Sequence, residues 1–177
     1  MLRGNGCVRP LFETVTDLRG GAEVLGRRAY GVIEAADGRF RRVVLRPFPT
    51  LVSLAEIFLL GKWYHRRRSA DRCLLYYDQP WRYRNFLVVK YVVSGRGASG
   101  GTCRRVLDVL DEIARLKRTD ALLCHLATRR ISPQMMARWG WEPHCRSRWQ
   151  RHYIKRFYGD YPPQADWITS VAESATL

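Results

Sequence analysis

Lysine, acidic residues and paired cysteines are all scarce in this sequence of 177 residues. Four of the 31 basic residues are lysine and the rest are arginine, while Asp and Glu together number 16, so the formal net charge is +15. None of the five cysteines belongs to a Cys-x-x-Cys pair, which argues against zinc fingers and disulfide scaffolds. We therefore expect reduced thiols in a cytoplasmic protein that has no metal site.

Long apolar runs are missing as well. The most apolar stretch, residues 50–64, is shorter than the roughly 20 residues that a helix needs to cross a bilayer. The first ten residues, MLRGNGCVRP, lack the apolar core of a signal peptide. The sequence thus predicts a protein that neither spans a membrane nor is secreted.

The excess of arginine favours a polyanionic partner, such as nucleic acid, an anionic membrane or a phosphorylated cofactor. The densest run, HRRR at residues 65–68, directly follows the apolar stretch. Three interpretations of this run stay open: a cationic last turn that suits the negative end of a helix, an interfacial anchor, or a polyanion contact. Because the arginines are scattered along the chain, a solvated surface without a partner is the alternative for the charge as a whole.

The sequence predicts one folded domain, since 46% of its residues are hydrophobic and no repeat or interdomain linker is visible. We expect a partly irregular N-terminal arm over residues 1–29, the domain over residues 30–159, and a loosely packed C-terminal tail over residues 160–177. The expected elements are a hairpin at 30–48 around Asp37-Gly38, helices at 50–64, 102–117 and 133–139, and strands at 72–78, 86–93, 121–128 and 151–159.

Residues 85–117 join a strand, a glycine-rich turn and a helix without a break. Gly95, Gly97, Gly100 and Gly101 allow the backbone to turn sharply and to approach a ligand closely. A glycine turn that opens a helix directs free N–H groups and the positive helix end at one point, which is typical of a phosphate site. The P-loop signature is absent, because no Gly-Lys-Ser/Thr occurs. The unit also lies too late in the chain for the dinucleotide-binding fingerprint.

The order of these elements resembles that of the GNAT superfamily of N-acetyltransferases. The pyrophosphate loop of that family is Arg/Gln-x-x-Gly-x-Gly/Ala, and residues 96–101 of this chain are RGASGG. Arg96 and Gly101 match the pattern, whereas Ser99 stands where the family has glycine. Gly140-Trp141 corresponds to a Gly-Phe that ends a short helix in the family. The resemblance covers about residues 75–159.

The resemblance implies an α/β fold with a mixed, mostly antiparallel sheet of six or seven strands and helices on both faces. It also implies that acetyl-CoA or another acyl-CoA is bound, with its pyrophosphate on the loop amides and its pantetheine arm along residues 90–93. The neighbouring Arg104 and Arg105 would screen phosphate charge. A fourth-strand amide near Val92 or Val93 would hold the oxyanion. The implied cofactor-binding residues are Val92, Val93, Arg96, Gly97, Ala98, Ser99, Gly100, Gly101 and Thr102.

Catalytic side chains are harder to assign. The family often protonates the leaving thiolate with a tyrosine four residues before the Gly-Phe glycine, and that position is Met136 here. The candidates that remain are Asp78 and His125 as bases and Tyr153 as an acid, with Tyr91 and Tyr158 as further donors. Each has a structural alternative: a turn-forming carboxylate, a core histidine, or a sheet tyrosine.

The leading hypothesis is an N-acetyltransferase-like protein that binds acyl-CoA and transfers the acyl group to an amine. A non-catalytic GNAT-fold binding or regulatory module is the first alternative, since Ser99 and Met136 depart from the family pattern. A basic protein that binds a polyanion such as nucleic acid, with a purely structural glycine turn, is the second. The acceptor amine is not predicted, and both a monomer and a dimer stay open.

Overall fold

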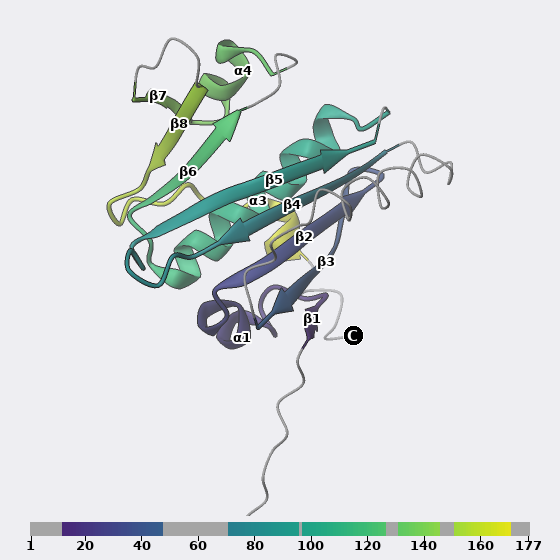
Figure 1. The fold of residues 1–177 in the computed structure, drawn as a ribbon. Coiled ribbons are helices and arrows are strands. Elements are labelled where there is room, and N and C mark those ends of the chain that lie inside the picture. Colours follow the sequence, from purple (N-terminus) through teal and green to yellow (C-terminus); the bar gives the residue numbers. More distant parts are fainter. Residues whose placement is uncertain (1–11, 48–70, 96, 127–130, 146–150, 171–177) are drawn as a thin grey trace, which may run out of the picture.

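The computed structural model describes residues 12–47, 71–95, 97–126, 131–145 and 151–170. They form one eight-stranded sheet in the order β1-β3-β2-β4-β5-β6-β8-β7 (Figure 1). Every neighbouring pair is antiparallel except β5 and β6. The strands are β1 Glu13–Val15, β2 Tyr30–Ala36, β3 Arg39–Arg46, β4 Arg72–Asp78, β5 Phe86–Ser94, β6 Ala121–Leu126, β7 Glu142–His144 and β8 Arg151–Arg156.

The predicted α/β class and mostly antiparallel sheet are confirmed, but the sheet has more strands than the expected six or seven. The additional strands are β1 and β7, which have three residues each and lie at the two edges of the sheet. A strand of three residues is too short to show the alternation of apolar and polar residues by which strands are predicted from sequence. They form because a longer neighbour offers its open edge.

The hairpin predicted at 30–48 is confirmed as β2 and β3. Asp37 and Gly38 form its two-residue turn, with φ angles of 54° and 70°. Two positive φ angles in succession match the twist of the flanking strands, and Asp-Gly adopts them at low cost.

A long helix covers one face of the sheet. This helix, α3 (Gly100–Lys117), buries Val106, Val109, Leu110 and Ile113 at helical spacing. The sequence predicts its start at Thr102, two residues too late. The connection from β5 through α3 to β6 is the expected parallel crossover.

The region before residue 30 contributes to the core. A short helix, α1 (Ala22–Arg27), packs its fully buried Leu25 into the main hydrophobic cluster. The side chain of Lys117, at the end of α3, donates to the carbonyl oxygens of Gly26 and Arg28. The last turn of α3 therefore holds the end of α1 in place.

The expectation of a loosely packed tail is wrong for residues 161–168. The Tyr161 hydroxyl donates to the carbonyl oxygen of Thr119 at 3.0 Å, and Ile168 is buried. The ring of Trp167 lies 6.0 Å from that of Phe40 on β3. The short helix α5 (Asp166–Ser170) thus packs beside α3.

The short helix predicted after Ser132 is confirmed as α4 (Pro133–Arg138), with the Ser132 hydroxyl as its N-cap and Gly140 at φ 80° after its end. The helix expected at 50–64 and the arginines at 66–68 lie outside the described residues. In the described part of the chain, no helix has the length and apolar character needed to cross a bilayer.

Candidate functional site

The parallel strands β5 and β6 separate partway along their length. Their pairing begins at Phe86 and ends at Val89, opposite Cys124. β5 continues to Ser94 while paired with β4 on its other side, and β6 continues while paired with β8. Figure 1 shows β6 and β8 turning away from β5. Within the described ranges, residues 90–94 therefore have no strand on the β6 side.

This unpaired edge leads to the N-terminus of α3. Ser99 is the N-cap, and its hydroxyl oxygen accepts from the Thr102 amide at 3.1 Å. The amides of Gly100 and Gly101 have no acceptor among the described residues. A Cβ placed on Gly100 would meet nothing within 4 Å, and on Gly101 only the Ser99 hydroxyl at 3.7 Å. Both glycines are exposed, so two N–H donors that lack an acceptor in the described part of the chain lie at the positive end of a long helix.

A carboxylate already occupies part of this helix end. The Ser99 amide donates to Asp71 Oδ1 at 2.8 Å, and the Ser99 hydroxyl donates to Asp71 Oδ2 at 2.9 Å. Hydrogen bonds from the Thr102 side chain and then from the Ser99 amide lower the pKa of Asp71. Asp71 is therefore ionised at neutral pH, and its charge lies beside the two free glycine amides.

Three of the loop amides predicted to bind pyrophosphate have partners within the protein. The Ser99 amide donates to Asp71, the Thr102 amide donates to Ser99, and the Ala98 amide donates to the Gly95 carbonyl oxygen at 3.1 Å. The amide donors left at the start of the helix are those of Gly100 and Gly101. Any phosphate on this loop would share the helix end with Asp71.

The other predicted cofactor residues lie at or near this edge. Val92 is half exposed and Val93 is partly buried. Both lie in the half of β5 that pairs with β4 but has no partner on the β6 side. Gly97 is exposed at the start of the loop, and Arg96 lies outside the described residues.

The two arginines predicted to screen phosphate charge have structural contacts. Arg104 donates to Asp108 at 2.7 Å, one helical turn further along α3. Arg105 donates to the Gly38 carbonyl oxygen at 3.0 Å and lies over the Trp167 ring at 4.3 Å. Arg105 thus ties the β2–β3 turn and the C-terminal segment to α3.

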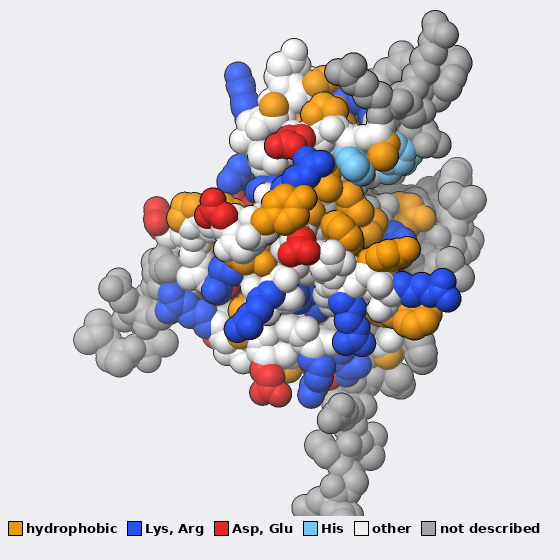
Figure 2. Space-filling model, turned by 90° about the vertical axis from the view of Figure 1, so that its left-hand side faces the viewer, with side chains coloured by type: hydrophobic (Ala, Val, Ile, Leu, Met, Phe, Trp, Pro, Cys, Tyr) orange, Lys and Arg blue, Asp and Glu red, His pale blue; other side chains and the backbone are white. Residues whose placement is uncertain are grey.

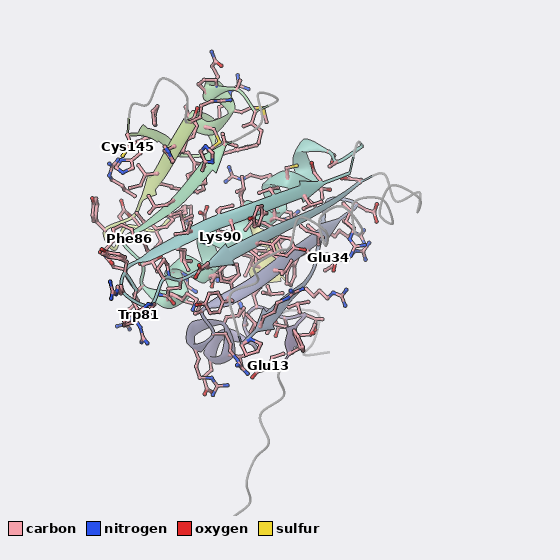
Figure 3. The ribbon with its side chains drawn as sticks, viewed as in Figure 1. Glu13, Glu34, Trp81, Phe86, Lys90 and Cys145 are labelled. Carbon is pink, nitrogen blue, oxygen red and sulfur yellow. The ribbon has the colours of Figure 1, made fainter. Side chains whose placement is uncertain are left out.

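Asp78 ends β4 on the sheet face opposite α3, since its neighbour Tyr77 belongs to the core on the α3 side. The Lys90 ammonium lies 3.4 Å from Asp78 Oδ2. Figure 3 labels Lys90 partway along β5, where the register with β4 shifts by one residue. Asp78 Oδ1 is buried and has no hydrogen-bond partner among the described residues.

His125 lies on β6 just beyond the last residue paired with β5, and its side chain is exposed. Because Leu122 and Cys124 pack toward α3, alternation places His125 on the same sheet face as Asp78. One strand separates the two, and His125 lies two residues beyond Leu123, which is level with Asp78 across β5. Strand spacing and rise therefore put them at least about 12 Å apart.

A second histidine lies against His125. The His125 ring is 4.9 Å from that of His152 on β8, and His152 is in turn the register partner of His144 on β7. The sequence did not indicate that His152 lies beside His125, because this neighbourhood depends on the β6–β8 register.

The candidate acids are not gathered at one point. Tyr153 is 5% exposed, belongs to the core on the α3 side and accepts from Arg151 at 3.2 Å. The sheet therefore separates it from Asp78 and His125. Met136 is buried in α4, whereas Tyr91 is 43% exposed in the unpaired half of β5.

Two cysteines meet where β4 begins and α3 starts. Cys73 is fully buried on β4, and Cys103 is half-buried in the first turns of α3. A hydrogen bond from the Cys73 thiol lowers the pKa of Cys103 to about 7, and the same bond together with burial raises the pKa of Cys73. Cys103 is the more reactive of this pair.

Two further features lie away from this site. A hollow between α3 and residues 162–168 is lined by Arg104, Asp108 and Trp167 and includes none of the predicted catalytic residues. In the described ranges, no three His, Cys, Asp or Glu side chains are close enough together to hold a metal ion.

No protein-family model matches the sequence, and no curated protein matches it. Among solved structures, the fold is similar to that of a nourseothricin acetyltransferase, with 13% sequence identity and a TM-score of 0.40. The alignment covers 83% of this chain and 99% of that one. Because this likeness is low, the functional argument rests on the geometry of the site.

Proposed function

We propose that this chain binds an acyl-CoA and transfers its acyl group to an amine. The observation that supports the proposal is the separation of β5 from β6, which leaves an open strand edge leading to two free amides at the start of α3. The edge could accept an extended amide-bearing arm as an added strand. The helix end suits the phosphates that follow such an arm.

The same geometry suggests where each part of the ligand would bind. The pyrophosphate would accept hydrogen bonds from the Gly100 and Gly101 amides, in the open space beside them. The pantetheine arm would follow residues 90–94 back toward the point where the strands separate, a span of roughly 15 Å. The thioester would then lie near Val89, between the strands that carry Asp78 and His125.

The reaction would join the amine nitrogen to the thioester carbonyl and expel the CoA thiolate. A β5 amide beside the thioester, near Val89 where the strands separate, would stabilise the oxyanion, because Val92 and Val93 lie three and four residues further along β5. The amine proton would pass to His125 or to Asp78, which share one sheet face. Tyr91, exposed in the same half of β5, is better placed than the buried Tyr153 to protonate the thiolate. A thiol with a pKa near 8.5 can also leave as the unprotonated thiolate. The lack of an efficient proton donor would therefore slow the reaction without preventing it.

A non-catalytic CoA-binding module is the second candidate. It is favoured by Asp71, which occupies part of the helix end, and by the absence of any described contact that joins Asp78, His125 and Tyr153 into one chain of proton transfer. The two candidates predict the same binding and differ in turnover.

The test measures binding and turnover on the same samples. Acetyl-CoA at a hundredfold excess over its Kd should stabilise the protein by about 2.7 kcal/mol, or roughly 5–10 °C in melting temperature. Gly101→Asp should abolish this shift, because it places a carboxylate against the phosphates. Its own melting temperature should stay close to that of the wild type, since the space is open and an acid suits the first helical turn.

Gln134→Asp is the matched control, because it adds the same carboxylate at the second position of α4. It should keep the full shift. Release of free thiol from acetyl-CoA with a panel of amines, between pH 6.5 and 9.5, then separates an enzyme from a binding module. If millimolar acetyl-CoA gives no shift and calorimetry shows no heat, the proposal is wrong.

A further inference from the structure

The turn between β4 and β5 exposes large aromatic rings. Trp81 is 73% exposed and Tyr83 is 63% exposed, and Arg82 and Arg84 alternate with them along the chain. Tryptophan is on average a highly buried residue. A turn that presents two such rings to solvent is therefore unlike the surface of an ordinary connection.

A third exposed ring comes from a turn that is distant in sequence. Tyr158 is 73% exposed, and its amide donates to the carbonyl oxygen of Asp120 at 3.2 Å. The Asp120 amide donates in turn to the carbonyl oxygen of Asn85 at 2.7 Å. Through Asp120, the turn that carries Tyr158 lies beside the turn that carries Trp81 and Tyr83.

These turns meet at one end of the sheet, where Figure 3 labels Trp81 and Phe86. Figure 2 looks at this end and shows hydrophobic side chains gathered near its centre, with Lys and Arg side chains around them. We name it the aromatic–arginine surface and define it by six exposed residues: Trp81, Arg82, Tyr83, Arg84, Arg118 and Tyr158.

The arginines of this surface are not neutralised. Among the described residues, no carboxylate lies within ion-pair distance of Arg82, Arg84 or Arg118. The nearby carboxylate of Asp120 accepts instead from the Asn85 side chain at 3.1 Å. The surface therefore presents three arginines without an ion pair among the described residues beside its rings.

Hydrogen bonds hold the turn in one shape. The Tyr83 amide donates to the Pro80 carbonyl oxygen and the Phe86 amide to the Tyr83 carbonyl oxygen, both at 3.0 Å. The Gln79 side chain donates to the Arg84 carbonyl oxygen at 2.6 Å. A backbone fixed in this way presents its rings without first having to be ordered, which favours binding.

We propose that the aromatic–arginine surface binds single-stranded nucleic acid. Unpaired bases would stack on Trp81 and Tyr83, and the phosphates would lie against Arg82, Arg84 and Arg118. The Arg82 guanidinium already lies 5.1 Å from the centre of the Trp81 ring, so a base on that ring would also meet a cation. Alternating rings and arginines are the combination that binds single strands without sequence preference.

Single strands fit this surface better than a duplex or a lipid surface does. In a duplex the bases are stacked on one another and offer no face to a ring. A membrane anchor of this size would combine aromatic rings with aliphatic side chains that enter the lipid, whereas all the apolar members here are aromatic. The proposal does not depend on acyl-CoA binding, because the surface lies at the opposite end of α3 from Gly100.

The test is fluorescence anisotropy of labelled 20-nucleotide strands, U20 and dT20, compared with a 20-base-pair duplex at several salt concentrations. Trp81→Ala/Tyr83→Ala should weaken single-strand binding at least about fivefold per ring and leave duplex binding unchanged. Arg82→Gln/Arg84→Gln should reduce the log–log salt slope for single strands by about 1.4, since each phosphate contributes about 0.7.

Arg39→Gln/Arg41→Gln is the matched control. It removes the same charge from exposed positions on β3, and it should change single-strand affinity less than twofold. Because all four substituted residues of the surface are exposed, circular dichroism and melting temperature should match those of the wild type.

Two results would overturn the proposal. One is single-strand binding that Trp81→Ala/Tyr83→Ala leaves intact, or the absence of any such binding. The other is binding to phosphatidylserine vesicles, without binding to either strand, that the same double substitution removes. The second result would assign the surface to a membrane.

Discussion

At the N-terminal end of α3 the carboxylate of the residue just before β4 holds the helix, whereas at the C-terminal end a lysine of α3 holds the helix α1. Asp71 accepts from the amide and the hydroxyl of Ser99. Lys117 donates to the carbonyl oxygens of Gly26 and Arg28 and to the side chain of Gln79, at 2.7–3.1 Å. Each end is thus stabilised by the charge that its helix dipole favours.

The two ends differ in what they leave unoccupied. At the C-terminal end all three ammonium hydrogens of Lys117 have acceptors, and the Arg118 amide closes the helix on Ala114 and Arg115. At the N-terminal end the amides of Gly100 and Gly101 have none among the described residues. One end is completed within the protein, while the other has capacity for a ligand.

The largest effect should follow from removing the lysine at the completed end. Lys117→Met keeps the length of the side chain but leaves three acceptors without their donor. Part-buried acceptors that lose a charged donor are costly, so we expect a loss of about 2 kcal/mol in the free energy of unfolding, measured by urea denaturation. Acetyl-CoA should still raise the melting temperature, because the other end is unchanged.

Burial, assisted by Arg84, lowers the pKa of Lys117 to about 8. Lysine in an unfolded chain has a pKa near 10.4, so between these values the unfolded state binds more protons and stability rises with pH. The difference between the wild type and Lys117→Met should therefore widen from pH 8 to pH 10. Lys90→Met, which removes an exposed lysine, is the control and should cost under about 0.5 kcal/mol. Equal losses in the two variants would contradict this account.

Patterns confined to a few neighbouring residues predicted most of the fold. Asp37-Gly38 marked the hairpin, Ser132 with Pro133 marked α4, and the apolar spacing from Val106 to Ile113 marked α3. Each signal lies within one element and needs no distant partner.

What the sequence did not predict depends on partners far along the chain. The start of α3 at Gly100 depends on Ser99, which is held by Asp71, 28 residues earlier. The two free amides could be predicted from the glycine turn, but the carboxylate beside them could not. Likewise, the pairing of His125 with His152 is set by strand register.

The next effect in size concerns Asp71, the charge at the open end. Asp71→Asn should raise the affinity for acetyl-CoA at least about threefold, because a carboxylate near a pyrophosphate repels it. This change is opposite in sign to that of Gly101→Asp, which adds a carboxylate at the same helix end. Isothermal titration calorimetry at low salt measures both.

Asp71→Asn should also lower the melting temperature slightly at neutral pH. Because the pKa of Asp71 is lowered in the folded state, its contribution to stability is present above about pH 3.9 and is lost as the pH falls through the lowered value. The melting temperatures of variant and wild type should therefore converge in acid. Glu23→Gln, in the exposed first turn of α1, should leave acetyl-CoA affinity unchanged. Weaker binding by Asp71→Asn would show that the phosphates do not lie beside Asp71.

The smallest effect concerns Cys103, which lies within one turn of the free amides and reports on access to them. Because the Cys73 thiol lowers the pKa of Cys103 to about 7, its alkylation by iodoacetamide should level off near pH 7, as followed by peptide mass spectrometry. Cys73→Ala removes the donor, so the levelling should move toward pH 8.5 and the rate at pH 7 should fall several-fold. Saturating acetyl-CoA should slow alkylation of Cys103 and leave that of the exposed Cys145 unchanged. An unaltered pH profile in Cys73→Ala would show that the Cys73 thiol does not lower the pKa of Cys103. Equal alkylation rates with and without acetyl-CoA would show that the ligand binds away from this end of α3.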